Sequence, residues 1–382
     1  MELPRRQFFR QMFTGLGAAA TLPVLGESAW SGNWRSLQFE TAPGSAIRLD
    51  SNENPYGPCS RGCEILKDNA NGANRYPKHD YIDLAEAIAA THGVSRERVV
   101  LGCGSAENLR MAAAVYLGPG KTLILASPTF ELIAQYAEKL GAQVVNVPLT
   151  RDHAHDMNAM LERAGTGQGL VYICNPNNPT ATLTPRADLE AFVRKLPSGY
   201  TVLMDEAYHH FVTSSAAAYT SFLDRPLESD QLIVTRTFSK IYGLAGMRIG
   251  YAISTPDTAK RLAAQKVDWA MSLLAARAGM AAWNDPDHVR NAASRNANDR
   301  REFYNQAKAR GIPVIESQTN FAMLDSGRPV QQVIDHFKKN NVLIGRPFPP
   351  YTNYARISFG TPPEMQEFWR VWDLLPAQNL PA

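Results

Sequence analysis

The chain has 382 residues and carries 39 lysines and arginines against 36 aspartates and glutamates, which gives a formal net charge of +3. Hydrophobic residues make up 45% of the sequence and charged residues 20%, the balance of an ordinary globular protein long enough for two domains. A charge this small and this dispersed argues against nucleic acid as a partner.

The N-terminus, residues 1–29, has the pattern of an export signal. Arg5 and Arg6 precede two phenylalanines and an apolar stretch that ends near Leu25 and is too short to span a bilayer comfortably. This pattern is typical of a twin-arginine signal with cleavage near Ala29. It predicts a periplasmic protein without stable membrane anchoring after export, and a cytoplasmic one if the signal is not used. The alternative is an amphipathic N-terminal arm.

Apolar runs then alternate with helix-like patterns from about residue 75 to residue 285. Short runs that are apolar on both faces, separated by helices, predict a mainly parallel, seven-stranded sheet covered on both sides, in an α/β fold. The predicted strands span residues 98–104, 121–128, 142–149, 169–176, 200–207, 231–239 and 247–254. The predicted helices between them span residues 105–117, 129–141, 184–196 and 255–267.

The pattern changes after residue 285. A charged helix over 285–311 leads into short strands at 321–325, 341–346 and 355–360. We therefore predict a large domain over 75–285 and a smaller α+β domain over 286–382, which the segment 30–74 joins.

The cysteines and histidines do not suggest a metal. Cys59, Cys63, Cys103 and Cys174 form no C-x-x-C pair, and the histidines show no metal-ligand spacing, so no metal site is expected. Free thiols are expected, with a bridge between Cys59 and Cys63 as the alternative.

One lysine stands out. Lys240 lies in "RTFSKIYGLAGMRIGY" (236–251), directly after a predicted strand and among small and hydroxyl residues, with Arg248 eight positions later. Burial disfavours the ammonium form, so such an amine becomes nucleophilic near neutral pH. The alternative is a surface lysine, which the apolar flanking sequence disfavours.

Eight motifs occur in a characteristic order: "LDSNENPYGP", "RYPKHDYIDL", "LGCGSAENL", "SPTF", "NPNNPTAT", "DEAYHHF", "TFSKIYGLAGMRIGY" and "ARISFGTP". Together they resemble the class I/II aminotransferases, pyridoxal-phosphate enzymes of fold type I, and most closely the histidinol-phosphate aminotransferase branch. The resemblance covers about residues 45 to 365. A single motif of this kind is weak, whereas eight in order are specific.

The resemblance implies how the ring of pyridoxal 5'-phosphate would be held. Lys240 would carry the coenzyme as a Schiff base, and Asp205 at a strand end would keep the ring nitrogen protonated. Tyr208 and Asn178 would hydrogen-bond the phenolic oxygen, and Phe130 would stack on the ring. Lys240, Asp205 and Tyr208 form the predicted catalytic set.

The coenzyme phosphate requires backbone N–H groups and cations. The turn "GCGS" opens a predicted helix, so its amides and the helix dipole suit an anion. The resemblance implies that one residue, Tyr76, reaches the phosphate from a neighbouring subunit. The predicted phosphate contacts are Gly104, Ser105, Ala106, Thr237, Ser239, Arg248 and Tyr76.

The resemblance also implies a substrate side. Arg356 would grip the acid group of the substrate, which identifies an anion without saying which one, since a guanidinium suits a carboxylate and a phosphate equally. Arg346 would be a second substrate-side arginine, with a surface loop position as the alternative. Asn52 and Tyr56 would line the same side.

Three features depart from the histidinol-phosphate branch. Ala181 stands where the family usually has glycine, which narrows the allowed backbone. The stretch 266–279, which includes Trp269 and Arg277, replaces a Pro/aromatic/Asn stretch that faces the substrate in relatives. Export is also unusual for an enzyme of cytoplasmic histidine synthesis. These departures weigh against histidinol phosphate as the donor and leave the donor open.

The implied function is an aminotransferase that moves an amino group from an anionic donor, an amino acid or a histidinol-phosphate-like compound, to a 2-oxo acid. The resemblance further implies a homodimer with shared active sites. Decarboxylation, racemisation or elimination on the same scaffold is the alternative, with a phosphothreonine-type decarboxylase as the nearest such relative. A coenzyme-binding regulatory protein is disfavoured because the catalytic set is complete and no helix-turn-helix domain is appended.

Overall fold

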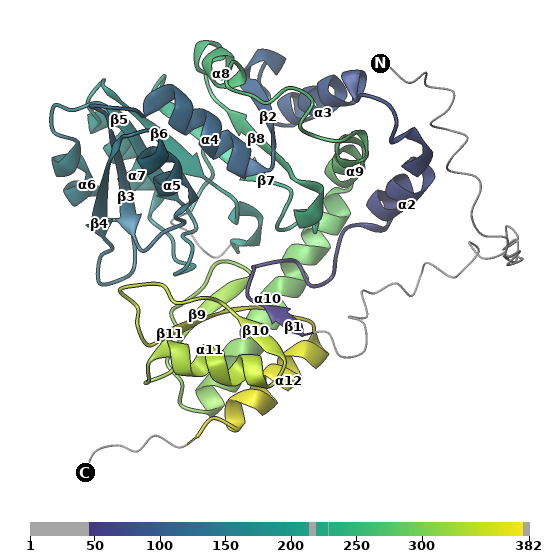
Figure 1. The fold of residues 1–382 in the computed structure, drawn as a ribbon, viewed down its shortest axis with the longest axis vertical. Coiled ribbons are helices and arrows are strands. Elements are labelled where there is room, and N and C mark those ends of the chain that lie inside the picture. Colours follow the sequence, from purple (N-terminus) through teal and green to yellow (C-terminus); the bar gives the residue numbers. More distant parts are fainter. Residues whose placement is uncertain (1–45, 214–218, 228, 377–382) are drawn as a thin grey trace, which may run out of the picture. The chain divides into compact units, whose positions relative to one another are not determined.

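The computed structural model of the protein describes residues 46–213, 219–227 and 229–376. The predicted export signal over residues 1–29 lies outside these ranges. Within them the elements form two layered bodies, a large one around a seven-stranded sheet and a smaller one around two short sheets (Figure 1).

The large sheet has the strand order β2-β8-β7-β6-β5-β3-β4. The pairs among β3 to β7 are parallel, whereas β8 runs antiparallel to both of its neighbours. The predicted seven-stranded, mainly parallel sheet is therefore confirmed. The strands are β2 (Val99–Cys103), β3 (Thr122–Ser127), β4 (Gln143–Pro148), β5 (Gly169–Cys174), β6 (Tyr200–Asp205), β7 (Leu232–Thr237) and β8 (Ile249–Ile253).

The central strands are apolar on both faces because each face packs against its own helices. In β5, Val171 and Ile173 join one buried cluster, whereas Leu170 and Tyr172 join another, as the two-residue period of a strand requires. Helices α3, α6, α7 and α9 contribute to the first cluster, and α4, α5 and α8 contribute to the second. The sheet is thus covered on both sides.

The helices of this body include four that the sequence pattern predicts and four more that it did not separate from loops. The predicted ones are α4 (Ser105–Tyr116), α5 (Leu132–Lys139), α7 (Arg186–Lys195) and α8 (Pro256–Ala263). The others are α2 (Ser60–Asp68), α3 (Lys78–Thr91), α6 (Met157–Ala164) and α9 (Leu273–Trp283). Helix α9 packs against both α2 and α3.

The smaller body combines the end of the chain with one early strand. Strand β1 pairs in parallel with β10, and β9 pairs antiparallel with β11. Leu49 of β1 is buried in the same cluster as Phe337 and Phe368. The segment before residue 75 therefore contributes a strand to the smaller body and helix α2 to the larger one. The elements are β1 (Ile47–Leu49), α10 (Pro286–Ala309), β9 (Phe321–Asp325), α11 (Val330–Lys339), β10 (Val342–Ile344), β11 (Tyr354–Ser358) and α12 (Pro362–Asp373).

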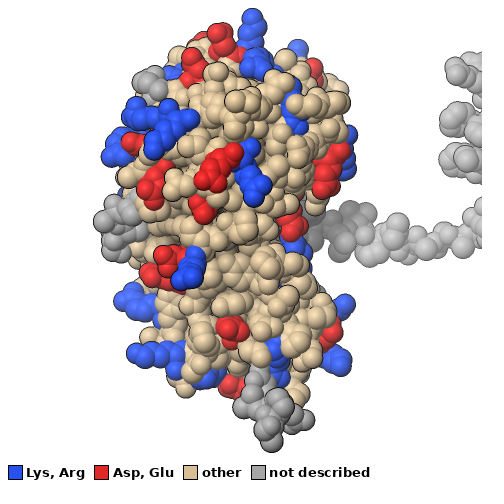
Figure 2. All heavy atoms as spheres, turned by 90° about the vertical axis from the view of Figure 1, so that its left-hand side faces the viewer, with Lys and Arg blue, Asp and Glu red and all other residues tan. Residues whose placement is uncertain are grey.

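The surface carries charges of both signs. On the face drawn in Figure 2, lysines and arginines alternate with aspartates and glutamates over both bodies and leave wide uncharged areas between them. Among the described residues, no helix combines the length and apolar character needed to cross a membrane.

Candidate active site

Lys240 follows β7 at the carboxyl edge of the parallel strands, where sites in such sheets form. Its Nζ donates hydrogen bonds of 3.0 Å to the backbone carbonyls of Ser51 and Asn52, which reach it from the loop after β1. Burial, reinforced by the nearby positive charge of Arg356, lowers the pKa of Lys240 to about 8. The amine is therefore far more nucleophilic at neutral pH than an ordinary lysine.

Asp205 ends β6 on the same edge and is buried. One carboxylate oxygen accepts a hydrogen bond of 2.8 Å from the Tyr172 hydroxyl, and the other accepts one of 3.1 Å from the Ala207 amide. Burial raises the pKa of Asp205 to about 6, although the Tyr172 bond opposes that shift. The carboxylate is consequently ionised at neutral pH and oriented by two donors, as a partner for a ring cation must be.

Tyr208 and Asn52 are joined directly. The Asn52 side-chain N–H group donates to the Tyr208 hydroxyl at 3.0 Å, and the Asn52 side-chain oxygen accepts from the Ser358 hydroxyl at 3.0 Å. Burial raises the pKa of Tyr208 above its usual value, so the hydroxyl stays protonated and can donate a hydrogen bond. The Lys240 Nζ lies 5.6 Å from the centre of the Tyr208 ring.

Arg356 extends from β11 of the smaller body toward the same place. Its guanidinium donates to the Asn178 side-chain oxygen at 2.7 Å and to the Asp50 carbonyl. The residue is only 7% exposed, and its Nε has no hydrogen-bond partner among the described residues. Burial lowers the pKa of Arg356 to about 10, which leaves it charged at neutral pH.

A phosphate cradle lies at the start of α4. Gly104, with φ +74°, precedes the first helical residue Ser105, so the first amides of α4 are open toward an anion. Arg248 supplies the cation, and its guanidinium donates to the Ser239 hydroxyl at 3.2 Å. Ser239 also accepts from Thr237 at 2.9 Å, so the predicted hydroxyl donors stand beside the arginine.

The phosphate cradle depends on two glycines, Gly104 and Gly250, whose positions leave no room for a side chain. A Cβ at Gly104 would overlap the Arg248 guanidinium, and a Cβ at Gly250 would overlap the Ser105 amide. Arg248 itself adopts left-handed backbone angles, φ 56° and ψ 63°, which a non-glycine residue rarely holds outside a site that requires it. These features fit a site in which the backbone approaches a bound phosphate group closely.

Three other predicted residues lie further out. Phe130 is 37% exposed. Tyr56 directs its hydroxyl to Asp299 of α10 at 3.0 Å, with Arg295 over its ring. Arg346 is paired with Glu131 rather than with a residue near Lys240.

The departures from the family pattern have structural consequences. Ala181 adopts φ 63°, the left-handed region that glycine enters without cost, and its placement costs roughly 1 kcal/mol. Arg277 on α9 bonds Asp80 at 2.7 Å and also contacts Asn69. Trp269 is 49% exposed. The stretch 266–279 therefore contacts α2 and α3.

Sequence reasoning missed several residues that support the site. Tyr172 orients Asp205, Ser358 orients Asn52, and Asn320 donates to the Asn52 carbonyl at 3.1 Å. Tyr172 could have been found, because it is the only hydroxyl in an otherwise apolar strand beside Asp205. Ser358 and Asn320 gave no such signal, since each meets Asn52 across more than 250 positions of sequence.

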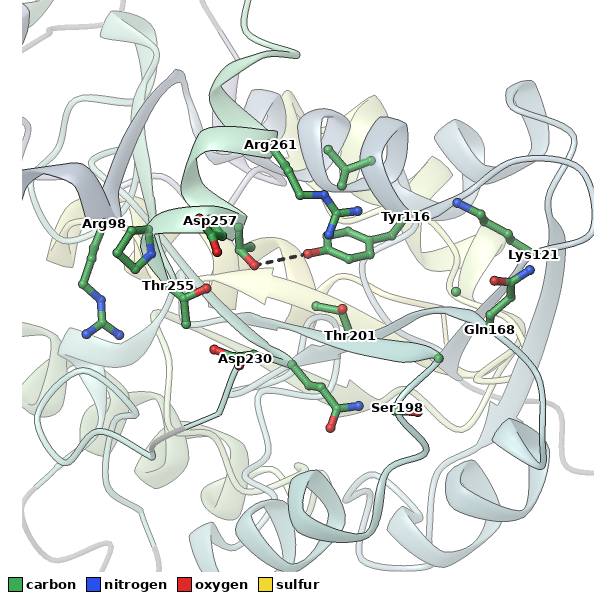
Figure 3. Close-up of a pocket in the computed structure, with 16 residues that line it drawn as sticks. Arg98, Tyr116, Lys121, Gln168, Ser198, Thr201, Asp230, Thr255, Asp257 and Arg261 are labelled. Atoms are coloured by element: carbon green, nitrogen blue, oxygen red, sulfur yellow. Dashed lines mark hydrogen bonds between the residues drawn. The ribbon is translucent and has the colours of Figure 1, made fainter.

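A separate hollow of about 910 Å³ lies at the opposite, amino edge of the sheet (Figure 3). Its wall mixes the cations Arg98, Lys121 and Arg261 with the carboxylates Asp230 and Asp257. A hydrogen bond of 3.5 Å between Tyr116 and Thr258 crosses one side of it. This wall mixes charges of both signs, and ligands of parallel sheets bind at the carboxyl edge, so the carboxyl edge is the better candidate for chemistry.

Comparisons with known proteins agree with this geometry. Residues 45–371 match the family model described as aminotransferase class I and II. The chain is 33% identical over 336 residues to a histidinol-phosphate aminotransferase of Moorella thermoacetica, covering 87% of this chain and 86% of the relative. It is 34% identical over 323 residues to an aromatic amino acid aminotransferase of Rhodococcus jostii, covering 85% and 88%.

A solved structure supports the same assignment. Histidinol-phosphate aminotransferase from Sinorhizobium meliloti, in complex with pyridoxal-5'-phosphate, superimposes with a TM-score of 0.81 at 25% identity, covering 94% of this chain and 100% of that one. The fold and the enclosed lysine thus define a pyridoxal-phosphate enzyme of fold type I. The chain belongs to the class I and II aminotransferase family and is a pyridoxal-phosphate-dependent aminotransferase. The alternative chemistries on this scaffold have less support.

The residues present fit the coenzyme. Bound pyridoxal phosphate supplies an aldehyde that condenses with amines and a ring that withdraws electrons from them. Lys240 offers the amine, Asp205 a buried and oriented carboxylate, and Arg248 with the start of α4 an anion cradle. Asn178 and Tyr208 present further polar atoms, held by Arg356 and Asn52 respectively.

The lowered pKa of Lys240 predicts how the coenzyme is taken up. A lysine with a pKa of about 8 is half neutral at pH 8, whereas one with the ordinary pKa of about 10.4 is roughly 0.4% neutral there. The rate at which the coenzyme-free protein binds pyridoxal phosphate to lysine should therefore rise through pH 8 and level off above about pH 9. Stopped-flow absorbance of the lysine-bound coenzyme measures this rate, and a simple alkylamine, whose rate keeps rising over the same range, is the control. A rate that still climbs tenfold between pH 9 and 10 would contradict the prediction.

Proposed function

We propose that the protein takes the amino group from an anionic donor, an amino acid or a histidinol-phosphate-like compound, and passes it to a 2-oxo acid. The observation that carries the proposal is Arg356, a buried, charged guanidinium whose charge acts on both Lys240 and Tyr208. A buried cation of this kind is stabilised by an incoming acid group, and a planar carboxylate matches its geometry.

The chain's own residues divide the work between binding and proton transfer. Arg356 holds the donor's acid group, while Lys240 Nζ removes the proton at the donor's amino-bearing carbon and later returns one. Asp205 keeps the ring nitrogen of the coenzyme protonated, and the Tyr208 hydroxyl and Asn178 hold its phenolic oxygen. The cradle of Gly104, Ser105, Ala106, Thr237, Ser239 and Arg248 anchors the phosphate.

Substituting Arg356 tests the donor class. In Arg356→Gln, kcat/KM for a carboxylate-bearing donor such as phenylalanine should fall about 100-fold, because charge-assisted hydrogen bonds worth about 1.5–3 kcal/mol each are lost. Conversion of phenethylamine, which lacks the carboxylate, should change little and serves as the matched control substrate. Coenzyme absorbance during a single half-reaction measures both. An equal loss with both amines would show that Arg356 does not grip the acid group.

We also propose that two copies of the chain share their active sites. Tyr76 is 74% exposed, and its ring packs 5.4 Å from that of Trp269, which is itself half exposed. Val267 lies in the same stretch as Trp269 and is also exposed. Large apolar and aromatic side chains left together at a surface favour a protein partner, and Tyr76 is the residue expected to serve a neighbour's phosphate.

Complementation between two defective chains tests the shared site. Tyr76→Ala and Lys240→Ala should each be inactive or strongly impaired alone. Coexpression should restore activity, because one site of each mixed dimer combines an intact Lys240 from one chain with an intact Tyr76 from the other. Mixed dimers isolated through two different affinity tags allow activity per site to be measured. Mixed dimers no more active than the parents would refute a shared site.

We further propose that the protein is exported folded through the twin-arginine route. The support is the Arg5–Arg6 pattern and the start of the family match at residue 45, which leaves the N-terminal segment outside the catalytic unit. Replacing both arginines by lysine should shift the protein from the periplasmic to the cytoplasmic fraction, and the exported form should begin after Ala29. Cell fractionation and N-terminal mass spectrometry measure this. An uncut protein with the same distribution in both forms would refute export.

A further inference from the structure

We infer that Glu131 is a specificity-determining residue that disfavours amino donors whose acid group is a phosphate and favours donors whose acid group is a carboxylate. Glu131 forms an ion pair of 2.6 Å with Arg346, the second arginine expected on the substrate side. The inference rests on the proposed function, in which Arg356 holds the donor's acid group, and a large, doubly charged acid group would meet Arg346 as well.

Arg346 stands beside Arg356 on the substrate side. Both guanidinium groups lie over the ring of Phe348, at 4.3 and 4.7 Å from its centre. The Gly345 amide donates to the Arg356 carbonyl at 2.9 Å, which holds the two chain segments together. The positive charge of Arg346 also contributes to the lowered pKa of Arg356. A phosphate held by Arg356 therefore comes within reach of Arg346.

Glu131 follows Phe130, the residue predicted to stack on the coenzyme, and occupies the N-cap position of α5. An N-cap carboxylate ordinarily accepts hydrogen bonds from the first amides of its own helix. In the described part of the chain, Glu131 makes no such capping bond and is directed at Arg346 instead. The ion pair thus links the large body to the smaller one at the edge of the coenzyme site.

The pair changes the charge that a donor meets. A guanidinium alone attracts a phosphate dianion, but paired with Glu131 it presents no net charge. Both side chains are 50% exposed, so the pair itself is weak and a phosphate could displace the carboxylate. The displaced Glu131 would then remain close to the dianion, and like-charge repulsion at such range disfavours binding about tenfold or more.

A carboxylate avoids this conflict. It is smaller and carries a single charge, so Arg356 alone can hold it and the Glu131–Arg346 pair stays intact. The site therefore favours donors such as phenylalanine over donors such as histidinol phosphate.

The test compares these two donors in the coenzyme-loaded protein. The wild type should show the higher kcat/KM with phenylalanine, and Glu131→Gln should shift the ratio toward histidinol phosphate about tenfold or more. Glu138→Gln is the matched control, because it removes the same charge from the same helix two turns further on. It should leave the ratio unchanged. The double variant Glu131→Gln/Arg346→Gln should lose the gain.

The outcomes separate this inference from the proposed function. If both donors convert the coenzyme but Glu131→Gln leaves their ratio unchanged, or the gain survives without Arg346, the role of Glu131 is wrong while the proposed function stands. A wild type that prefers histidinol phosphate likewise overturns it. If neither donor converts the coenzyme, the proposed donor class is wrong, and the inferred role of Glu131 is wrong as well.

Discussion

Enclosure of one amine is the constraint on which the rest of this site depends. Lys240 leaves the end of β7 and is closed over by the loop after β1, whose Ser51 and Asn52 carbonyls accept its hydrogen bonds. Water is excluded from one side of the amine, and this desolvation is the main cause of its lowered pKa. The two carbonyls replace only part of the hydration that the ammonium group loses. The lysine side chain is therefore fixed in place, and its amine is neutral more often than that of an exposed lysine.

The surrounding charges follow from the same enclosure. The positive charges of Arg356 and Arg248 oppose the protonation of Lys240, whereas Glu53 and the buried Asp205 favour it. The excess positive charge suits a coenzyme and a donor that are both anionic, and it disfavours burial of the site without them. At its outer edge Glu131 offsets one further guanidinium, that of Arg346. The positive charges thus gather around Lys240, while the charge of Arg346 is offset by Glu131.

The large sheet was predictable because its signal is local. The run 169–174 is apolar at every position and the run 200–205 at all but Thr201 and Asp205, as a strand buried on both faces requires. Helix α9 begins at Leu273, inside the stretch 266–279 that was compared with a Pro/aromatic/Asn stretch of relatives, so it was not predicted as a helix. In the structure Arg277 is satisfied by Asp80 and Asn69. No local sequence pattern predicts these partners, because they lie 197 and 208 residues earlier in the chain.

The sequence by itself determined the chemistry, because each motif places a required group at the end of a strand: Lys240 after β7, Asp205 at the end of β6 and Gly104 after β2. Strand ends of one parallel sheet meet at one edge, so these residues had to converge. Only the tertiary structure decided the state and partners of those groups. The pKa of Lys240, the orientation of Asp205 by Tyr172 and the pairing of Arg346 with Glu131 all arise from contacts between segments far apart in sequence. Burial and hydrogen bonding act through space, and a linear pattern carries no record of them.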